Sequence, residues 1–461
     1  MPIAASLVAD LTAVVGDAHV RLAEADRLRY GTDGTTRGVA ADIVVLPADV
    51  QEVSRIARLC HDTRTPMVPR GAGTGYTGGA VPIAGGVVIS LERFTRILEI
   101  DEASLLAVVE PNVITGDLQD AVERVGLFYP PDPASLRQSA IGGNVAECAG
   151  GPRAFKYGVT RHYVLGLEAV LPNGDVIETG GRSVKNVVGY DLTQLLTGSE
   201  GTLAIITKII LRLIPKPPAA VTLRATFETV AAAADAVARL LRARVVPAAL
   251  ELIDGESLAA VTRHLGGGSR LAPEGTAALL LIEVDGLPEQ VAAEADRVTA
   301  ACRDGGATEL LRSTNDEERQ EMWRVRRELS PALKTIKPVK YNHDVVVPKG
   351  RIVELFALVD RLRAEFEVRI PCFGHAGDGN IHVNIMVDES DDDTRRAHQA
   401  EEMLFRGVVG LGGSISGEHG IGLAKAKYLP LELTPATIEA MKQIKRAFDP
   451  HGILNPGKIF P

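Results

Sequence analysis

Pro69-Arg-Gly-Ala-Gly-Thr-Gly-Tyr-Thr-Gly-Gly79 is a glycine-rich stretch that directly follows a short apolar run of the chain. Nearly half of its residues are glycine, which adopts positive φ angles and lets other atoms approach the backbone closely. Successive backbone N–H groups of such a segment can turn inward around anionic oxygens. Arg70 adds a fixed positive charge beside them. The stretch therefore predicts a loop that holds a diphosphate, with a flexible surface loop as the alternative.

Two more glycine-rich segments follow in the first half of the chain. They read Ile141-Gly-Gly-Asn-Val-Ala-Glu-Cys-Ala-Gly-Gly151 and Thr197-Gly-Ser-Glu-Gly-Thr-Leu203. One such segment alone is compatible with a surface loop. Three of them favour a large, extended cofactor that several backbone segments hold at once.

Taken together, these segments resemble a known flavoprotein group. The chain is similar to the vanillyl-alcohol oxidase superfamily, in the branch of D-lactate dehydrogenases, glycolate oxidase FAD subunits and D-2-hydroxyglutarate dehydrogenases. The resemblance covers nearly the whole chain and rests on residues 69–82, 141–159, 185–192 and 198–207 and on three C-terminal motifs described below. It implies an α+β protein with a PCMH-type FAD-binding domain, an α+β (ferredoxin-like) substrate or cap domain and a C-terminal helical segment.

The resemblance also implies how the cofactor is held. Relatives with covalent flavin carry a histidine at the position of Thr74, so non-covalent FAD is implied here. The implied cofactor-binding residues are Pro69, Arg70, Gly71, Ala72, Gly73, Thr74, Gly75, Gly79, Pro131, Asp132, Ile141, Gly142, Gly143, Asn144, Ala146, Gly150, Tyr157, Gly158, Glu200, Gly201, Ile206 and Asn455.

The composition limits the partners of the chain. The 461 residues carry a formal net charge of −9 and no basic run, which argues against nucleic acid and anionic membrane surfaces as partners. The N-terminus lacks the positive segment of a signal peptide. No apolar run reaches the ~18 residues that a membrane span requires. We expect a cytoplasmic protein that meets a membrane only through an electron-acceptor partner.

Cysteine spacing bears on the route of the electrons. Cys60, Cys148, Cys302 and Cys372 lie far apart in the sequence, as reduced core thiols do, whereas iron–sulfur ligation needs clustered thiolates. Electrons are therefore expected to leave for a separate acceptor protein. Relatives use an iron–sulfur subunit, an electron-transferring flavoprotein or a cytochrome, and the sequence does not choose among them. It also leaves the oligomeric state open, with a homodimer as one option.

Four segments are predicted along the chain. Helical spacing near the N-terminus predicts a helical arm over residues 1–35. Pro215, Pro217 and Pro218 lie close together, and prolines at this density stop both helices and interior strands. We therefore expect the FAD-binding domain to cover residues 36–218 and to end at these prolines. The substrate domain with the metal site is expected over 219–425. A C-terminal segment, 426–461, is expected to return to the FAD domain.

Local patterns predict several elements. A strand–helix–strand unit precedes the first glycine-rich stretch, and Asp49 with Glu52 resembles a capping box at the start of its helix. Asn173-Gly174 predicts a hairpin with a two-residue turn. The second half begins with a split β-α-β-β-α-β order. A similar order over residues 344–416 predicts a second layer of this kind.

A candidate metal site lies in Cys372-Phe-Gly-His-Ala-Gly-Asp-Gly-Asn-Ile-His-Val-Asn384. A two-residue turn at Asp378-Gly379 would place His375 directly opposite His382, with Cβ atoms about 4.5–5.5 Å apart. That separation suits two imidazoles on one ion. Asn384 shares the face of His382, and the apolar residues that alternate with them take the core face. Structural histidines are the alternative.

The third ligand is expected in Ser416-Gly-Glu-His-Gly-Ile-Gly422, where Glu418 and His419 stand between glycines. Two histidines and a carboxylate suit zinc, manganese or ferrous iron and leave positions for substrate. The resemblance implies His375, His382 and Glu418 as the ligands.

Substrate-binding residues are implied in Met322-Trp-Arg-Val-Arg-Arg-Glu328. The family pattern aligns its carboxylate-binding arginine with Arg326. This chain departs from the pattern because Arg327 stands where relatives have glutamate, so the choice between the two arginines stays open. Lys340 matches a lysine that lies near substrate in relatives, with a plain surface lysine as an equal alternative.

The resemblance, together with these residues, implies an FAD- and metal-dependent dehydrogenase that oxidises a D-2-hydroxy acid to the 2-oxo acid, with D-lactate as the first candidate. His419 is the expected general base, because an imidazole accepts a proton near neutral pH. Arg326, Lys340 and Asn384 complete the catalytic set. Glycolate and D-2-hydroxyglutarate are the alternative substrates. A non-redox FAD-binding subunit of a larger complex, an ether-lipid-forming relative and a metallohydrolase are rival classes.

Overall fold

The computed structural model describes residues 3–34, 38–266, 272–273 and 275–460, which form two compact units. The chain returns from the second unit to the first at Glu418, whereas the sequence predicts this return after residue 425. No helix of the described residues has the length and apolar character to cross a bilayer. The first unit comprises Met1–Gly150, Val159–Lys216 and Glu418–Pro461, and the second comprises Gly151–Gly158 and Pro217–Gly417.

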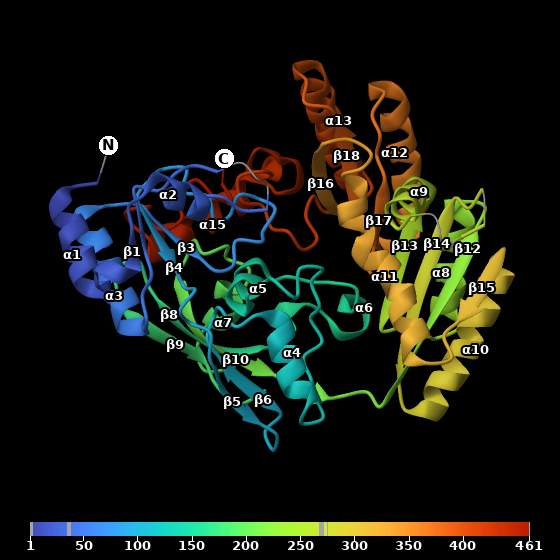
Figure 1. Ribbon diagram of the computed structural model, residues 1–461, viewed down its shortest axis with the longest axis horizontal. Helices are drawn as coiled ribbons and strands as arrows, with labels where there is room; N and C mark the ends of the chain where they lie inside the picture. The colour runs from blue at the N-terminus through green and yellow to red at the C-terminus, as the bar shows by residue number, and fades with distance from the viewer. Residues whose placement is uncertain (1–2, 35–37, 267–271, 274, 461) are drawn as a thin grey trace. The chain divides into compact units, whose positions relative to one another are not determined.

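The first unit begins with a four-stranded sheet in the order β1-β2-β4-β3. The predicted capping box forms only in part: Asp49 accepts a hydrogen bond from the Glu52 N–H as the N-cap of α3, but the Glu52 carboxylate accepts from the Ala48 N–H, one residue before the N-cap, and not from that of Asp49. The helices α1 and α3 pack against each other and bury apolar side chains against the sheet (Figure 1). The elements are α1 (Ala5–Val15), β1 (Val20–Arg21), β2 (Ile43–Val45), α3 (Val50–Thr63), β3 (Met67–Arg70) and β4 (Val87–Ser90).

The predicted N-terminal arm is not helical throughout. The strand β1 separates α1 from α2 (Glu24–Tyr30) and pairs with β2, so this part of the arm belongs to the first sheet. Residues 1, 2 and 35 of the predicted arm lie outside the described residues.

A five-stranded sheet, β5-β6-β10-β8-β9, follows in the same unit. The predicted hairpin joins β8 to β9, but its turn has three residues rather than two, because the Leu171 N–H bonds to the Asp175 carbonyl. Gly174 adopts a φ of 86° in this turn. The strands are β5 (Ile97–Asp101), β6 (Leu106–Val109), β8 (Val164–Val170), β9 (Val176–Gly180) and β10 (Ile205–Arg212).

Short helices and a two-stranded ribbon complete the first unit. The second glycine-rich segment is partly helical, since its first residues form α5. The remaining elements are α4 (Thr115–Glu123), β7 (Leu127–Phe128), α5 (Ile141–Glu147), α7 (Leu192–Leu196), β11 (Ile214–Pro215), α14 (Leu429–Glu432) and α15 (Pro435–Phe448).

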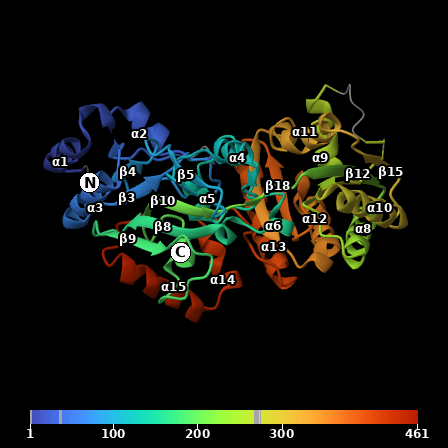
Figure 2. The ribbon, with the colours of Figure 1, turned by 90° about the horizontal axis from the view of Figure 1, so that it is seen from below.

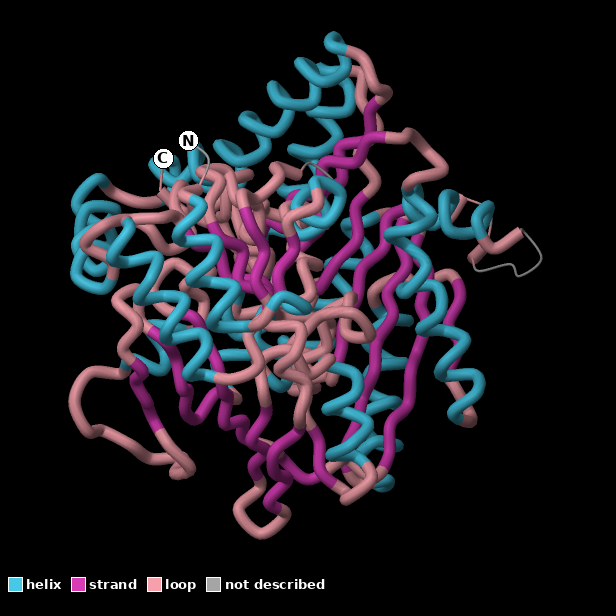
Figure 3. The backbone as a smooth tube through the Cα atoms, turned by 60° about the vertical axis from the view of Figure 1, so that its left-hand side comes forward, coloured by secondary structure: helices cyan, strands magenta, loops and turns pink. Residues whose placement is uncertain are grey.

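The second unit contains one seven-stranded sheet in the order β15-β12-β14-β13-β17-β18-β16, with all neighbours antiparallel. Figure 3 draws the strands of the chain in magenta and the helices in cyan. The prediction of two separate layers is wrong, because β13 and β17 pair and join the two halves. The strands are β12 (Ala219–Phe227), β13 (Ala249–Asp254), β14 (Ala278–Gly286), β15 (Glu309–Arg312), β16 (Val339–Val346), β17 (Cys372–His375) and β18 (Asn380–Val387).

Helices cover both faces of this sheet. In Figure 2, α9 and α11 lie on one face, and α8, α10, α12 and α13 lie on the other. Several of these helices start at side-chain caps; Asn315, for example, accepts a hydrogen bond from the Glu318 N–H at the start of α11. The helices are α8 (Val230–Arg242), α9 (Gly255–His264), α10 (Pro288–Asp304), α11 (Asp316–Leu333), α12 (Ile352–Phe366) and α13 (Asp391–Gly410).

A short excursion from the first half of the chain belongs to the second unit. It carries α6 (Ala154–Tyr157), whose Lys156 and Tyr157 side chains both donate to the carboxylate of Asp285, at 2.5 and 2.7 Å. A Cβ atom on Gly377 would come within 2.6 Å of the Phe155 ring, so glycine is required there. The excursion is thus fixed by hydrogen bonds and packing.

Candidate metal and flavin sites

The two predicted metal-ligating histidines lie on β17 and β18, but not in the predicted register. The turn between these strands has four residues, so His375 pairs with Asn380 and His382 pairs with Phe373. The expectation that the histidines face each other directly is therefore wrong. They are diagonal neighbours on one face, and their ring centroids lie 5.7 Å apart. A longer turn moves the pairing by two residues, which preserves the face of every side chain.

Alternation along these strands separates a polar face from a core face. Ile381, Val383 and Ile385 are completely buried, as predicted for the core face. The opposite face, which α11 covers, carries the histidines together with Asn384 and other polar residues. Because successive side chains of a strand point to opposite faces, the polar residues can form a ligand site on one face while the apolar residues pack in the core on the other.

Glu418 reaches the histidines through the end of the second unit. The segment before it pairs with β16, since Ser414 and Val346 exchange two backbone hydrogen bonds. The Gly417 N–H then donates to Asp344, which stands opposite His382 in the sheet. A Cβ atom on Gly417 would meet the Asn380 amide at 2.1 Å, so a larger residue there would have to displace the Asn380 side chain. Glu418 follows by a single peptide bond.

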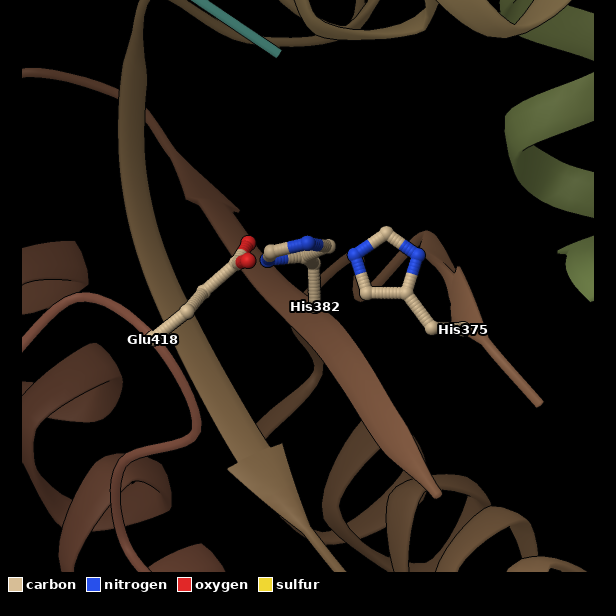
Figure 4. A group of neighbouring side chains, drawn as sticks. All are labelled: His375, His382 and Glu418. Carbon is tan, nitrogen blue, oxygen red and sulfur yellow. The ribbon is translucent and has the colours of Figure 1, made fainter. Parts of the chain in front are cut away.

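His375, His382 and Glu418 form a group that can hold a metal ion. One ligand atom of each lies within 4.8 Å of those of the others, and both histidines are buried (Figure 4). Two imidazole nitrogens and one carboxylate oxygen suit Zn²⁺, Mn²⁺ or Fe²⁺. The donor set and its spacing therefore fit the predicted metal.

Glu251 on β13 links this group to α11. The carboxylate is completely buried, and its two oxygens accept from different partners, the Nδ1 atom of His375 and the Nε atom of Arg326. Burial acts to raise the pKa of Glu251, but the charges and hydrogen bonds of His375 and Arg326 outweigh it and lower the pKa to about 2. Glu251 is therefore a carboxylate at neutral pH.

The two candidate arginines occupy different environments. Arg326 is buried, with its guanidinium 4.9 Å from the centre of the Phe373 ring. Apart from the bond to Glu251, no hydrogen bond of this guanidinium is found within the described residues. Arg327 instead turns toward the Gln320 carbonyl oxygen, at 2.9 Å. Only Arg326 is placed beside the histidines.

Two further predicted residues lie on the same face of the sheet. Lys340 on β16 donates to the Ser330 hydroxyl at 2.7 Å, and burial, aided by the positive charge of Lys334, lowers its pKa to about 8. Asn384 donates to the Pro371 and His382 carbonyls. Its buried side-chain oxygen has no hydrogen-bond partner within the described residues, so it is available to a polar ligand.

In the first unit, the three glycine-rich segments come together. The Glu200 N–H donates to the Ala146 carbonyl at 2.8 Å, which joins the second and third segments. The Asn455 side chain donates to the carbonyls of Gly79 and Glu200, at 2.9 and 2.8 Å, which joins the first and third. The structure thus gathers segments that lie far apart in the sequence.

The side chain of Arg70 connects the first glycine-rich segment to the chain near Tyr30 and Thr32. It donates to the Thr32 carbonyl at 2.7 Å, and its guanidinium stacks 5.9 Å from the centre of the Tyr30 ring. Burial lowers its pKa. Gly73 has a φ of 70°, and a Cβ atom there would come within 2.1 Å of the Arg70 side chain. Glycine is therefore required at position 73 on both counts.

Glu200 anchors the segment that carries His419. Its carboxylate accepts hydrogen bonds from the backbone N–H groups of Ile421 and Gly422, at 2.8 and 2.7 Å. Burial raises the pKa of Glu200 in spite of these bonds. The first glycine-rich segment also meets His419, because the Tyr76 and His419 ring centroids lie 5.4 Å apart. The expected base is thus held against the predicted cofactor loops.

The other implied cofactor residues are distributed over both units. Asn144 donates to the Thr115 hydroxyl at 2.7 Å, and the Pro131 carbonyl accepts from Gln119 at 2.9 Å. Tyr157 belongs to the excursion that the second unit includes. The remaining first-unit positions are Pro69, Gly71, Ala72, Thr74, Gly75, Asp132, Ile141, Gly142, Gly143, Gly150, Gly201 and Ile206, and Gly158 lies with Tyr157.

Sequence reasoning missed two residues of the metal group's surroundings, Glu251 and Asp344. Glu251 lies in β13, all of whose residues are buried, and Asp344 lies between two buried neighbours in β16. A charged side chain in a buried strand requires a partner, so the isolated acid in Ala249-Leu-Glu-Leu-Ile-Asp254 was a usable signal. Its partners could not be named, because they come from distant parts of the chain.

Comparisons with known proteins agree with this arrangement. The sequence matches the C-terminal domain of FAD linked oxidases over residues 216–459 and an FAD binding domain over residues 41–180. The chain belongs to the FAD-linked oxidase family. This FAD-linked oxidase is 43% identical over 452 residues to the glycolate oxidase subunit GlcD of Bacillus subtilis, covering 98% of the chain and 96% of that protein. It is 36% identical to a D-lactate dehydrogenase of Anaerostipes hadrus over 426 residues, covering 91% and 89%.

Solved structures confirm the predicted PCMH-type fold of this FAD-linked oxidase. p-Cresol methylhydroxylase with substrate bound superimposes with a TM-score of 0.83 at 21% identity, covering 98% of this chain and 96% of that chain. The 4-ethylphenol oxidase of Gulosibacter chungangensis gives a TM-score of 0.80 at 22% identity, covering 99% and 97%. At this identity the likeness concerns the fold alone.

Proposed function

We propose that this FAD-linked oxidase oxidises a D-2-hydroxy acid, D-lactate before others, to the 2-oxo acid in a metal-dependent reaction. The observation that carries the proposal is the group of His375, His382 and Glu418 with the buried cation of Arg326 beside it. A metal site next to an arginine suits a substrate with neighbouring hydroxyl and carboxylate groups. The names of relatives, glycolate oxidase subunit and D-lactate dehydrogenase, support FAD-linked oxidation of a hydroxy acid.

The residues have distinct proposed tasks. When bound, FAD supplies the acceptor for hydride from C2, and the divalent ion, held by His375, His382 and Glu418, supplies a Lewis acid. Arg326 binds the substrate carboxylate through its terminal nitrogens, since its Nε atom already donates to Glu251. His419 takes the hydroxyl proton.

Lys340 and Asn384 are proposed to complete the substrate pocket from the same face of the sheet. Lys340 adds a positive charge below its pKa of about 8. Asn384 offers the buried side-chain oxygen that lacks a protein partner in the described part of the chain. The FAD itself is proposed to bind non-covalently on the gathered glycine-rich segments, because Thr74 carries no nucleophile of the kind found in flavinylated relatives.

Glycolate is the second candidate substrate, and the observation that favours it is the 43% identity to the glycolate oxidase subunit. D-2-Hydroxyglutarate is a third. The word subunit in that name also supports a multi-subunit assembly. We propose that electrons leave the flavin for a separate protein in the cytoplasm, an iron–sulfur subunit, an electron-transferring flavoprotein or a cytochrome. The four described cysteines are all unpaired, and three of them are buried.

An anaerobic flavin-reduction screen tests the proposal. The purified protein is mixed with the D and L forms of 2-hydroxy acids of increasing size, together with glycolate, and bleaching of the oxidised flavin is followed. D-Lactate should bleach the flavin fastest, and a chelated sample should not bleach. Faster bleaching by glycolate makes glycolate the substrate. If no hydroxy acid bleaches the flavin of a sample loaded with metal and FAD, the proposal is wrong and the chain is a non-redox FAD-binding subunit.

A further inference from the structure

Glu251 connects the metal group to the arginine proposed to bind the substrate carboxylate. Its side chain is completely buried and has no contact with solvent. One carboxylate oxygen engages His375 of β17, and the other engages Arg326 of α11. Neither partner is close to Glu251 in sequence, and neither is close to the other. A completely buried carboxylate is costly unless both oxygens are satisfied, and these two contacts satisfy it.

We propose that Glu251 is a positioning residue that fixes the metal-ligating face of His375 and the carboxylate-binding face of Arg326 at the same time. This inference rests on the proposed function of the site. Its consequence is that metal affinity and substrate affinity depend on one buried carboxylate, although Glu251 itself contacts neither ligand.

The side of His375 that Glu251 engages determines which nitrogen is available. Nδ1 of His375 pairs with Glu251, and Figure 4 shows the other side of the ring directed toward His382, on the side of the proposed metal. A carboxylate behind a ligating imidazole fixes the ring orientation and raises its basicity. The same carboxylate holds Nε of Arg326 and so fixes the plane of the guanidinium, while no hydrogen bond of its terminal nitrogens is found within the described residues.

A purely structural role is the competing explanation, in which Glu251 only fastens α11 to the sheet. The chain contains a matched case of that role. Glu283 on β14 is also buried and accepts hydrogen bonds from Trp323 and Arg319 of α11, at 2.7 and 3.2 Å. Its partners are not histidines of the metal group. Substituting Glu283 therefore reproduces the loss of a buried acid under α11 while leaving His375 and Arg326 untouched.

The experiment compares Glu251→Gln with Glu283→Gln in the full-length protein. Zn²⁺ and Mn²⁺ affinities are measured by chelator competition on metal-free protein, KM and kcat are measured with D-lactate, and thermal unfolding is recorded. Glu251→Gln should weaken metal binding by ~10–100-fold and should raise KM at saturating metal. Glu283→Gln should lower the unfolding temperature and change metal affinity and KM by less than twofold.

Equal metal affinity and equal KM in Glu251→Gln and the parent protein overturn the inference, whatever happens to the unfolding temperature. If Glu251→Gln does not fold, Glu251→Asp replaces it. Its shorter side chain cannot reach His375 and Arg326 together, so at least one of the two constants should still worsen; parental values for both overturn the inference. Failure of the proposed function is seen separately, because the parent protein itself would then show no metal binding or no reduction by hydroxy acids.

Discussion

The gathered glycine-rich segments of the first unit and the metal group, whose two histidines belong to the second unit, differ in what they are made of. The first site consists mainly of backbone, held in shape by a few side chains such as Arg70, Glu200 and Asn455. The second consists of side chains, two of them on regular strands and Glu418 on a loop, and His375 is oriented by another buried side chain. Substitution should therefore act differently in the two: the backbone site is sensitive to added Cβ atoms, and the strand site is sensitive to lost functional groups.

The largest expected effect is that of removing a metal ligand. His382→Ala should reduce turnover below detection and abolish tight binding of the divalent ion, because two ligands remain. FAD content should stay at the parental level, since the proposed cofactor residues lie mainly in the other unit. Metal content by mass spectrometry and FAD content by absorbance measure both quantities on one sample. Loss of FAD together with the metal would show that the cofactor site and the metal group do not respond independently to substitution.

His343→Gln provides the control for this variant. His343 is a buried histidine of the same sheet, but it lies on the core face, where its ring packs 5.2 Å from that of Phe405. Some stability should be lost, whereas metal content should be unchanged. A variant that loses the metal in this position would show that general disruption of the sheet explains the His382 result.

The next effect separates the proposed tasks of two adjacent residues, metal ligation by Glu418 and proton transfer by His419. His419→Ala should keep metal and FAD and should slow flavin reduction by ~10²–10⁴-fold, the usual contribution of a positioned base. The loss should ease at high pH, where the substrate hydroxyl ionises more readily. Glu418→Gln should weaken metal binding as well as the rate. Stopped-flow reduction of both variants against pH measures this, and the reverse pattern would exchange the two roles.

Much of the fold was predictable because its signals are local. The N-cap at Asp49, the position of the hairpin at Asn173-Gly174 and the alternation of Ile381, Val383 and Ile385 are each decided by residues within a few positions. Errors arose where pairing is non-local. Nothing near β13 or β17 specifies that these strands meet, so one continuous sheet was mistaken for two layers.

The candidate site shows the same division. The types and spacing of His375, His382 and Glu418 indicated a metal group, and these residues do come together. The turn length between the histidines was wrong, because a four-residue turn and a two-residue turn keep the same faces and leave the same alternation in the sequence. Glu251 could be suspected as a buried acid, but its double bridge depends on three distant segments that only the fold brings together.

A smaller effect is expected from Gly73→Ala in the backbone site. The φ of 70° at Gly73 disfavours any side chain, and the added Cβ would meet the Arg70 side chain at 2.1 Å. Strain of this kind costs about 1–3 kcal/mol, so the FAD dissociation constant should rise by roughly 5–150-fold at that cost. Turnover at saturating FAD should be nearly parental. Titration of FAD-free protein with FAD measures the change.

Gly181→Ala is the control, because a Cβ atom there meets nothing within 4 Å, its φ lies outside the positive range and it is not among the proposed cofactor residues of the first unit. It should bind FAD within about twofold of the parent. If both alanine variants bind FAD equally well, the backbone conformation at Gly73 does not control cofactor affinity. The claim that the site of the first unit is sensitive to added Cβ atoms would then be wrong.

The smallest expected effect concerns Lys340. Because burial lowers its pKa to about 8, its positive charge is lost as the pH rises through 8. The KM for an anionic substrate should therefore increase by a few fold across this range, and Lys340→Met should raise KM at pH 7 and remove the dependence. Lys334→Met offers the control, because it takes away the second cause of the lowered pKa and should move the inflection to higher pH.

The lowered pKa of Lys340 also predicts that the folded state becomes more stable as the pH rises, although substrate binding becomes weaker over the same range. An unfolded lysine keeps its proton up to a pKa near 10.4, whereas folded Lys340 releases its proton near pH 8. The unfolded state therefore binds more protons between these values, and the free energy of unfolding should gain a contribution that grows with pH across this window. Denaturant titrations at pH 7.5, 8.5 and 9.5 should show this gain in the parent and not in Lys340→Met. If the two proteins change in parallel while KM still rises through pH 8, the group that titrates in the strand site is not Lys340, and its charge cannot be what draws the substrate to that site.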